Sequence, residues 1–578
     1  MSTYNTLLAN KIIRQVALVV LLLAVFIAPR AVALDQYVTI DETSWLMHSA
    51  NFYYGIATRN FEYTYQIYHP GVTTMWAGTI GMLLQYPEYR GQAPGHFDNS
   101  PELKFIDFYQ FIEAQGQDPL QLLTSMRLVI FSGQALGMLV VYFLARKLFG
   151  GRVALFSFLL IAFEPFYFAH SRFLNQDGTL TIMMLLSLLA LFLYLWQGRS
   201  RLMLALSGAA AALAWLTKSP TFFLIPFVGL VLLVEAFSHW WSQPDRKRNW
   251  LPVLWRELVL PMLIWLAAGA LTYTLVWPAM WVDPGGAVGS IFSVAVKRFF
   301  KQGGGVPSPQ VLSPGLFSFG YLNTYIRQSS PLTLLGILCY GAAFVRHAGL
   351  LADSSRRKPT IWLVVYAALF AVFMTIAGDK APRYVLPSFP PLDIIAAIGW
   401  LEVFRLLTAR LTRPLALKKY LPLAAAVLFA ALYLQPLIST YPYYIHYTSP
   451  LRDRPKTIPE MSIGWGEGLD QAARYLNQKP NAHELSAMSW YGLGPFSFFF
   501  EGQWHGIRLG VEWRGEDADI LKEMDYLVMY GNQWRRNMPA GLLLALEGAV
   551  PEHTVWIDGF EYVRIYAVET LPEAVFNP

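Results

Sequence analysis

The sequence contains little charge for its length. Only 14% of its 578 residues are Asp, Glu, Lys or Arg, against roughly 25% in typical soluble domains, whereas 55% are hydrophobic. This composition is typical of polytopic membrane proteins. The net charge of +6 is modest and is expected in cytoplasmic loops, so the sequence does not indicate a nucleic-acid partner.

Cysteine and metal-binding motifs are also scarce. The single cysteine, Cys339, lies in an apolar run, so no internal disulfide can form. No HExxH, CxxC or DxD spacing occurs, so no dedicated metal site and no certain cofactor is predicted. A divalent metal stays possible only if Asp41, Glu42 and His69 meet in space.

Long apolar runs recur along the first three quarters of the chain. About eleven of them approach the length needed to span a bilayer, near residues 13–34, 125–145, 153–169, 178–196, 202–217, 219–237, 258–280, 331–346, 360–377, 384–403 and 420–440. We expect the first to be an uncleaved helix; the alternative is a signal peptide cleaved near Ala31-Val32-Ala33. The shorter run 73–84 predicts a helix that lies at the membrane surface or dips into it.

Basic residues predict the orientation of these spans. With the N-terminus in the cytoplasm, each inner segment holds between two and five Lys or Arg residues. The three short outer loops hold only Arg172, Lys218, Lys380 and Arg383. The positive-inside rule favours this arrangement, and we expect a multi-pass protein of the plasma membrane.

Two parts of the chain differ in composition. Residues 1–440 are expected to form a membrane module with outer loops at 35–124 and 281–330, and residues 441–578 a soluble extracytoplasmic α/β domain. In this tail we expect a helix around GEGLDQAARYLNQ, strands in ELSAMSWYG, DYLVMYG and EYVRIYAVE, and a hairpin turn at Asp558-Gly559. We expect the tryptophans of this tail to pack in its core rather than to stack on a sugar.

Polar residues cluster in the outer segments. Asp41 and Glu42, in DETSW, could begin a helix in a solvated loop, or could act as a general base on a hydroxyl. In HSRFLNQDG, Asp177 could cap the following helix, with Arg172 and Asn175 as interfacial anchors. Neither interpretation explains why the scarce outer cations gather here. Snorkelling accounts for one cation, whereas a lipid phosphate would account for all four.

Two further segments carry possible functional residues. His69, in YHPG, could bind a metal or a phosphate, although a single histidine usually does neither. VAVKRFFKQGGG, in the second long outer loop, is basic and amphipathic. It is typical of a helix on a membrane surface, and its glycines would also permit a lid over a site.

Together these segments resemble GT-C type glycosyltransferases that use polyprenyl-phosphate sugars, the superfamily of protein O-mannosyltransferases and aminoarabinose transferases. The resemblance rests on Asp41-Glu42, HSRFLNQD, TKSP and KAPRYVLPSFPPL, in order over residues 10–440. Gly71 departs from the second proline that is more usual after the histidine, and the tail shows no β-trefoil signal.

The resemblance implies roles for these residues. Asp41 would be the catalytic base with Glu42 as its partner, and Arg172, Lys218, Lys380 and Arg383 would bind the carrier phosphate. His69, Asn175 and Asp177 are further candidates for substrate binding. The implied donor is a polyprenyl-phosphate-linked sugar, and the acceptor is a hydroxyl of a lipid, glycan or protein at the outer face.

Two other functions remain open at this point. A polytopic secondary transporter would place charges near the bilayer midplane and often shows repeated halves. A membrane receptor or scaffold could use the tail as its binding module, but this would not explain polar clusters in four separate outer segments.

Overall fold

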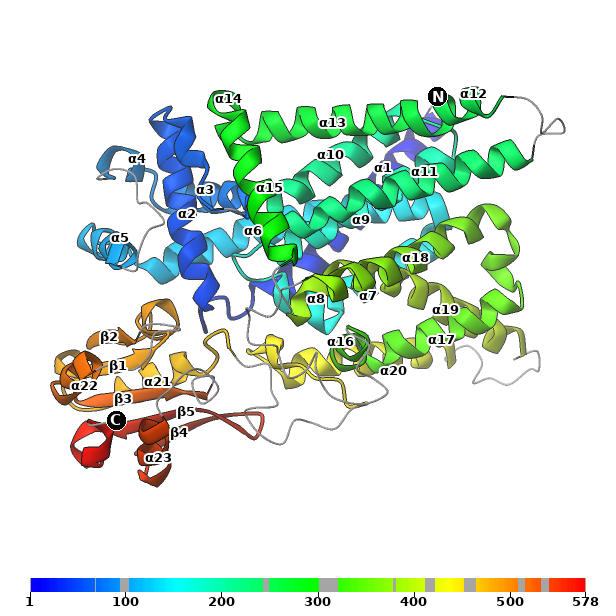
Figure 1. Cartoon of the computed structure of the whole chain (residues 1–578). Helices are drawn as coiled ribbons and strands as arrows, with labels where there is room; N and C mark the ends of the chain where they lie inside the picture. Colours follow the sequence, from blue (N-terminus) through cyan, green and yellow to red (C-terminus); the bar gives the residue numbers. More distant parts are fainter. Residues whose placement is uncertain are drawn as a thin grey trace.

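The computed structural model describes residues 2–67, 69–93, 103–242, 249–300, 321–377, 381–410, 421–451, 464–507, 515–531 and 540–576. A bundle of long helices runs across the molecule, and a small sheet lies beside one end of it (Figure 1). The polytopic helical fold class with a C-terminal α/β part is therefore confirmed.

The helices of the first half include the most deeply buried one. Their bounds are α1 (Ser2–Ala31), α2 (Ile40–Ala57), α3 (Val72–Gln85), α4 (Tyr89–Gln92), α5 (Leu103–Ala114), α6 (Pro119–Phe149), α7 (Gly151–Phe163), α8 (Pro165–His170), α9 (Asp177–Trp196), α10 (Arg201–Thr217) and α11 (Leu224–Trp241). Nearly all of α9 is buried, and it packs against α6 and α10. The helix α9 is thus the centre of the bundle.

The second half completes the bundle. Its helices are α12 (Trp250–Leu254), α13 (Leu260–Val276), α14 (Ala279–Val282), α15 (Pro284–Phe300), α16 (Leu322–Gln328), α17 (Pro331–Val345), α18 (Ser354–Ile376), α19 (Phe389–Arg410) and α20 (Leu421–Ser439). Among these, α13 packs on α10, and α17 packs on α19. A short 3₁₀ segment, Pro382–Ser388, precedes α19 and contacts α9.

Local sequence explains several helix ends. Asp118 accepts the backbone N–H of Leu120 at 2.8 Å before Pro119 begins α6, and Ser330 caps α17 in the same way before Pro331. Proline suits this position because it lacks the N–H that would be unpaired there. Pro165 likewise separates α7 from α8, so the run predicted at 153–169 is two helices.

All the predicted spans lie on helices, but some of these helices are short. Seven described helices are long and apolar enough to cross a membrane, and Gly151–Phe163, Arg201–Thr217 and Leu423–Ser439 are shorter apolar helices. The run at 384–403 begins in the 3₁₀ segment and continues into α19, which carries Asp393 and Glu402. The exact number of spans stays a prediction.

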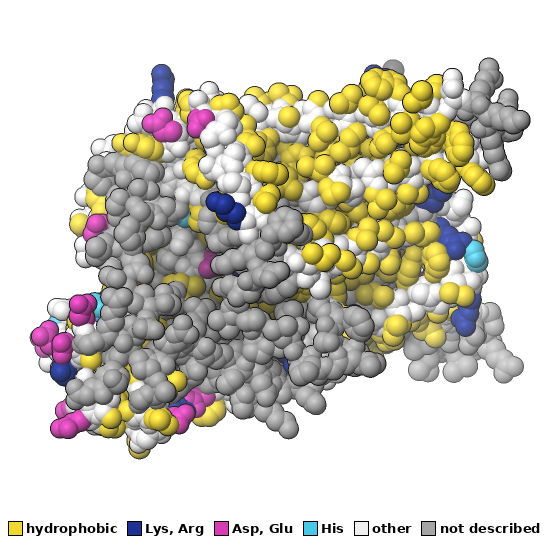
Figure 2. Space-filling view, viewed as in Figure 1, with side chains coloured by type: hydrophobic (Ala, Val, Ile, Leu, Met, Phe, Trp, Pro, Cys, Tyr) yellow, Lys and Arg dark blue, Asp and Glu magenta, His cyan; other side chains and the backbone are white. Residues whose placement is uncertain are grey.

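The bundle surface agrees with a membrane environment. Hydrophobic side chains cover the long helices in Figure 2, and several basic side chains lie at the end away from the sheet, with others elsewhere on this face. The run at 73–84 forms α3, which packs against α6 and α2 and has buried and exposed apolar residues.

The C-terminal sheet has five strands in the order β2-β1-β3-β5-β4. They are β1 (Ser486–Trp490), β2 (Gln503–Ile507), β3 (Tyr526–Tyr530), β4 (His553–Ile557) and β5 (Phe560–Ala567). Strand β1 pairs in parallel with β2 and β3, whereas β5 is antiparallel to β3 and β4. The same part of the chain contains the helices α21 (Leu469–Leu476), α22 (Gly515–Lys522) and α23 (Ala540–Gly548).

The turn of this sheet was predictable. Asp558 and Gly559 both have positive φ, 49° and 80°, as expected for the tight hairpin turn that joins β4 to β5. The predicted helix and three predicted strands are confirmed as α21, β1, β3 and β5. The strand β2 was not predicted, because QWHGI contains a glycine and lacks a clear alternation.

Candidate functional site

The helix α2 begins inside the DETSW segment and orients its two carboxylates differently. Thr39 is the N-cap residue, so Asp41 and Glu42 occupy the second and third helical positions. The Glu42 carboxylate turns back and accepts the backbone N–H and the hydroxyl of Thr39, both at 3.0 Å. The Asp41 side chain remains 39% exposed, whereas that of Glu42 is completely buried.

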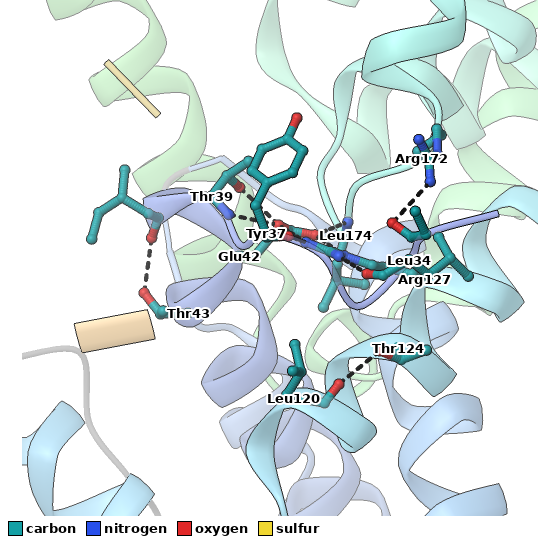
Figure 3. Close-up of polar contacts among 12 residues, drawn as sticks. Leu34, Tyr37, Thr39, Glu42, Thr43, Leu120, Thr124, Arg127, Arg172 and Leu174 are labelled. Carbon is teal, nitrogen blue, oxygen red and sulfur yellow. Dashed lines mark hydrogen bonds and ion pairs between the residues drawn. The ribbon is translucent and has the colours of Figure 1, made fainter. Parts of the chain in front are cut away.

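Glu42 is bound on every side. Arg127 of α6 donates from Nε at 2.7 Å and from Nη2 at 2.5 Å to the two carboxylate oxygens. The backbone N–H of Leu174 donates at 2.8 Å (Figure 3). Arg127 also donates to the carbonyls of Leu34 and Tyr37. Glu42 therefore joins the first outer segment, α6 and the HSRFLNQD segment, and has no oxygen free for substrate.

Arg172 faces away from this pair and supports the backbone of the first outer segment. Its guanidinium donates to the carbonyls of Arg30 at 3.1 Å and Ala33 at 3.3 Å, and also to that of Val32. It also lies 4.6 Å from the ring centroid of Tyr444. The side chain is buried and Figure 3 shows it apart from Glu42. The guanidinium of Arg172 is therefore occupied by backbone carbonyls, and this geometry does not support its predicted contact with a phosphate.

A network of four charged side chains forms where the other outer segments meet. Arg383 Nη2 lies 3.4 Å from Asp41 Oδ2, and Arg383 Nε lies 3.4 Å from Asp177 Oδ2. Lys218 Nζ donates to Asp177 Oδ1 at 2.8 Å. We call Asp41, Arg383, Asp177 and Lys218 the charge network. One residue each comes from the four outer segments that the sequence singled out.

The charge network is enclosed on one side and open on the other. The Asp177 and Lys218 side chains are 6% and 9% exposed, whereas Arg383 is 25% exposed. Burial lowers the pKa of Arg383, but Asp41, Tyr384 and Asp177 outweigh it, so that the pKa lies above the usual arginine value. The site thus presents a permanent cation beside an accessible carboxylate.

Asp177 is held in place by its own segment. Its backbone N–H donates to Asn175 Oδ1 at 3.0 Å, which fixes the start of α9. Its carboxylate does not cap that helix but turns to Lys218 and Arg383. The Nδ2 of Asn175 is buried and has no hydrogen-bond partner among the described residues. An unpaired donor beside the charge network is available to a ligand.

The YHPG segment lies against the TKSP segment. The backbone N–H of Gly71 donates to the carbonyl of Thr217 at 3.2 Å, next to Lys218. Gly71 has a φ of +60°, and a Cβ there would lie 2.2 Å from the Trp45 ring, which explains why proline cannot stand at this position. His69 is half-buried two residues before it, close to the site along the chain.

Three predictions are only partly covered by the structure. Lys380 lies outside the described residues. Among the described residues, no group of three His, Cys, Asp or Glu side chains could hold a metal ion. Residues 294–300 of the basic amphipathic stretch form the end of α15, and Val288 and Phe292, earlier in this helix, are exposed. The lid proposed for this stretch involves glycines outside the described residues.

Sequence reasoning missed Trp465. Its ring centroid lies 4.3 Å from the guanidinium carbon of Arg383 and 5.3 Å from the His170 ring. Burial lowers the pKa of His170 to about 3, so this imidazole is neutral at physiological pH. The only signal in the sequence was an aromatic residue between closely spaced glycines in GWGEG, which predicts a tight loop but no partner.

Comparisons with known proteins agree with the motifs over part of the chain. Residues 121–265 match the family described as dolichyl-phosphate-mannose-protein mannosyltransferase, which confirms the predicted resemblance over this segment. The match includes Arg172, Asn175, Asp177 and Lys218 but not Asp41 or Arg383. No protein of curated function shows significant similarity to the sequence.

Three solved structures with a similar course of the chain are distant in sequence. ArnT from Cupriavidus metallidurans, bound to undecaprenyl phosphate, has a TM-score of 0.47 and 17% identity, over 96% of this chain and 99% of its own. AglB from Archaeoglobus fulgidus, with an inhibitory peptide and a dolichol-phosphate, has a TM-score of 0.42 and 14% identity, over 89% and 70%. Mycobacterial AftD, an arabinofuranosyltransferase, has a TM-score of 0.34 and 14% identity, over 92% and 40%. These likenesses assign no role to any residue.

Proposed function

We propose that the protein is a membrane glycosyltransferase that moves a sugar from a polyprenyl-phosphate carrier to an acceptor hydroxyl at the outer face. The observation that carries this proposal is the charge network. The accessible carboxylate of Asp41 lies beside Arg383. Asp177 pairs with both Arg383 and Lys218. The family match over residues 121–265 supports the same class of donor.

The chemistry follows from the positions of these groups. The carrier phosphate binds Arg383 and Lys218 and replaces Asp41 as a partner of the arginine. Asp41 then removes the proton of the acceptor hydroxyl while its oxygen forms the new bond to the anomeric carbon. The bond from that carbon to the phosphate oxygen breaks on the opposite side, and the two cations stabilise the departing phosphate. A single displacement inverts the configuration.

The neighbouring residues take other parts in this proposal. Asp177 orients both cations, and the free Nδ2 of Asn175 together with His69 contacts the donor. Lys380, three residues before Arg383, is a further phosphate-binding cation. Glu42 and Arg172, which the sequence suggested for catalysis and phosphate binding, instead hold the outer backbone in place, because both are buried in contacts with protein groups.

The orientation and the extracytoplasmic place of the tail are part of the proposal. The charge network lies at the starts of α2 and α9 and just before α19, whereas several basic side chains lie at the opposite end of the bundle (Figure 2). If the basic end is cytoplasmic, the site opens to the outer face, where the sugar of a translocated donor is found.

The test is sugar transfer by purified protein in liposomes, from a panel of polyprenyl-phosphate sugars with acceptor-containing membrane extract. Asp41→Asn should lower the turnover of the consumed donor by roughly 10²–10⁴-fold, the usual contribution of a general base. The matched control is Asp35→Asn, an exposed carboxylate in the same segment, which should keep wild-type turnover. Equal turnover by wild type and Asp41→Asn would refute the role of Asp41. If wild type consumes no donor, the transferase itself is refuted.

A secondary transporter remains the second candidate because of one buried pair. Glu164 and Asp393 are fully buried among the bundle helices and share the hydroxyl of Thr333, at 2.9 and 3.5 Å. Buried carboxylates within membrane helices often relay protons in transporters. Transport predicts that Asp393→Asn abolishes activity and that Asp41→Asn does not, the reverse of what the transferase predicts.

A further inference from the structure

One residue of the C-terminal part contacts both sides of the charge network. The backbone carbonyl of Trp465 accepts the N–H of Ile40, the first residue of α2, at 3.1 Å. Its indole ring lies over the guanidinium of Arg383, 4.3 Å from its carbon atom. Trp465 is 8% exposed and the Arg383 side chain is 25% exposed, so the ring shields the guanidinium from water in part. A desolvated ring and cation attract each other more strongly than an exposed pair.

The loop that carries Trp465 is firmly held to the sheet. Glu467 accepts the N–H of Trp465 at 3.2 Å and also the hydroxyl of Tyr530 in β3. The same hydroxyl accepts the N–H of Gly466 at 3.1 Å. Gly466 has a φ of +107°, and a Cβ there would lie 2.7 Å from Pro495 and 3.0 Å from the Val38 carbonyl. The backbone of this loop is therefore held by the sheet, while the indole itself packs against His170 and Phe173 of the membrane part.

Other contacts dock the tail without reaching the charge network. Arg474 Nη2 donates to the carbonyl of Gln36 at 2.9 Å, and the rings of Phe498 and Tyr109 lie 5.3 Å apart. The tail could thus remain attached without the Trp465 ring. This separates the role of the indole from the role of docking.

We propose that Trp465 is a positioning residue of the phosphate site, through which the C-terminal part completes the active centre. Its ring covers one face of the Arg383 guanidinium and directs it at the place of the phosphate. Its carbonyl fixes the first turn of α2, one residue before Asp41. This inference rests on the proposed function and adds that the phosphate site is completed by a residue of the C-terminal part.

The test measures binding of a polyprenyl monophosphate, without sugar, to the purified full-length chain in detergent. Trp465→Leu removes the ring and should raise the Kd roughly tenfold, in line with the strength of desolvated cation–π pairs. Trp465→Phe restores an aromatic face and should return the Kd to within about threefold of wild type. Arg383→Gln should also raise the Kd, because it removes the phosphate partner.

The double variant decides whether the indole acts through the arginine. If it does, Trp465→Leu adds no further loss of binding in the Arg383→Gln background. A purely structural effect would instead multiply with that of Arg383→Gln. The matched control, Phe498→Leu, weakens docking elsewhere and should lower the Tm while leaving the Kd unchanged.

The outcomes separate this inference from the function on which it rests. If wild type binds the phosphate and Trp465→Leu binds equally well, or if the two effects multiply, the inference is wrong and the proposed function stands. If wild type fails to bind any polyprenyl phosphate, the proposed function fails and the inference falls with it. A rise in Kd that is rescued by Trp465→Phe and absent in the Arg383→Gln background supports both.

Discussion

Asp41 and Glu42 are adjacent carboxylates that should respond in opposite ways to neutralisation. Glu42→Gln removes the charge that compensates Arg127, in a pair that is 0% and 3% exposed. It also replaces one of the oxygens that accept from Thr39, Leu174 and Arg127 by an amide donor. Breaking a buried pair by removing one partner costs about 3–5 kcal/mol.

The corresponding change in Tm can be worked out. At roughly 2.1 cal/mol/K per residue, 578 residues unfolding as one unit have an unfolding entropy of about 1.2 kcal/mol/K. We therefore expect Glu42→Gln to lower the Tm by about 3 °C, measured by intrinsic fluorescence at a fixed scan rate. Asp41→Asn, which loses only a partly exposed pair at 3.4 Å, should cost less than about 1 kcal/mol and leave the Tm nearly unchanged.

Activity completes this comparison. Asp41→Asn should lose transfer while staying folded, whereas Glu42→Gln should lose transfer only in proportion to its folded fraction. Hydrogen exchange of the first turn of α2 should accelerate in Glu42→Gln alone, because its N-terminal contacts are lost. The reasoning is refuted if Glu42→Gln keeps the wild-type Tm and yet has no activity, since the buried carboxylate would then act in the chemistry.

Three further variants test other features. Gly71→Ala should lower the Tm more than Gly116→Ala, because both glycines have positive φ but only the first would clash with Trp45, at a cost of about 1–3 kcal/mol. Arg172→Lys should lower the Tm and leave the Kd for polyprenyl phosphate unchanged; a raised Kd would show that this arginine contacts the phosphate. Burial raises the pKa of Asp470 to about 6, so the native state binds its proton more tightly than the unfolded state and loses stability as pH rises from about 4 to about 6. Asp470→Asn should therefore be more stable than wild type by about 1–3 kcal/mol above pH 6, and this advantage should vanish near pH 4 in thermal unfolding across that range.

The sequence allowed the fold class and the assembly of the site to be predicted, because both follow from patterns along the chain. Apolar runs located the helices, and the positive-inside rule grouped Asp41, Asp177, Lys218 and Arg383 on one side. These patterns alone could not tell Asp41 from Glu42, which only the family resemblance distinguished, because their different surroundings depend on α2 beginning after Thr39. If the helix began one residue earlier, Asp41 and not Glu42 would occupy the third helical position.

The sequence also could not show that the outer cations have different partners. Arg172 and Arg383 both stand in outer segments, but only the structure shows that one meets backbone carbonyls and the other two carboxylates. The contacts of Trp465 could not be predicted from the sequence for another reason. Its partners, Ile40 and Arg383, are far away in the chain, and no local periodicity reports such a contact.

The distances along the chain within the site bear on how the protein matures. Asp41 and Arg383 are separated by 342 residues, and Trp465 is synthesised after both. A ribosome has therefore delivered almost every helix to the membrane before the last contact of the site can form. During this interval a newly inserted chain carries Asp41 and Arg383 but lacks the indole ring that lies over Arg383 in the finished protein. Under the proposed function, only molecules that have finished translation and docked their tail would have the complete site.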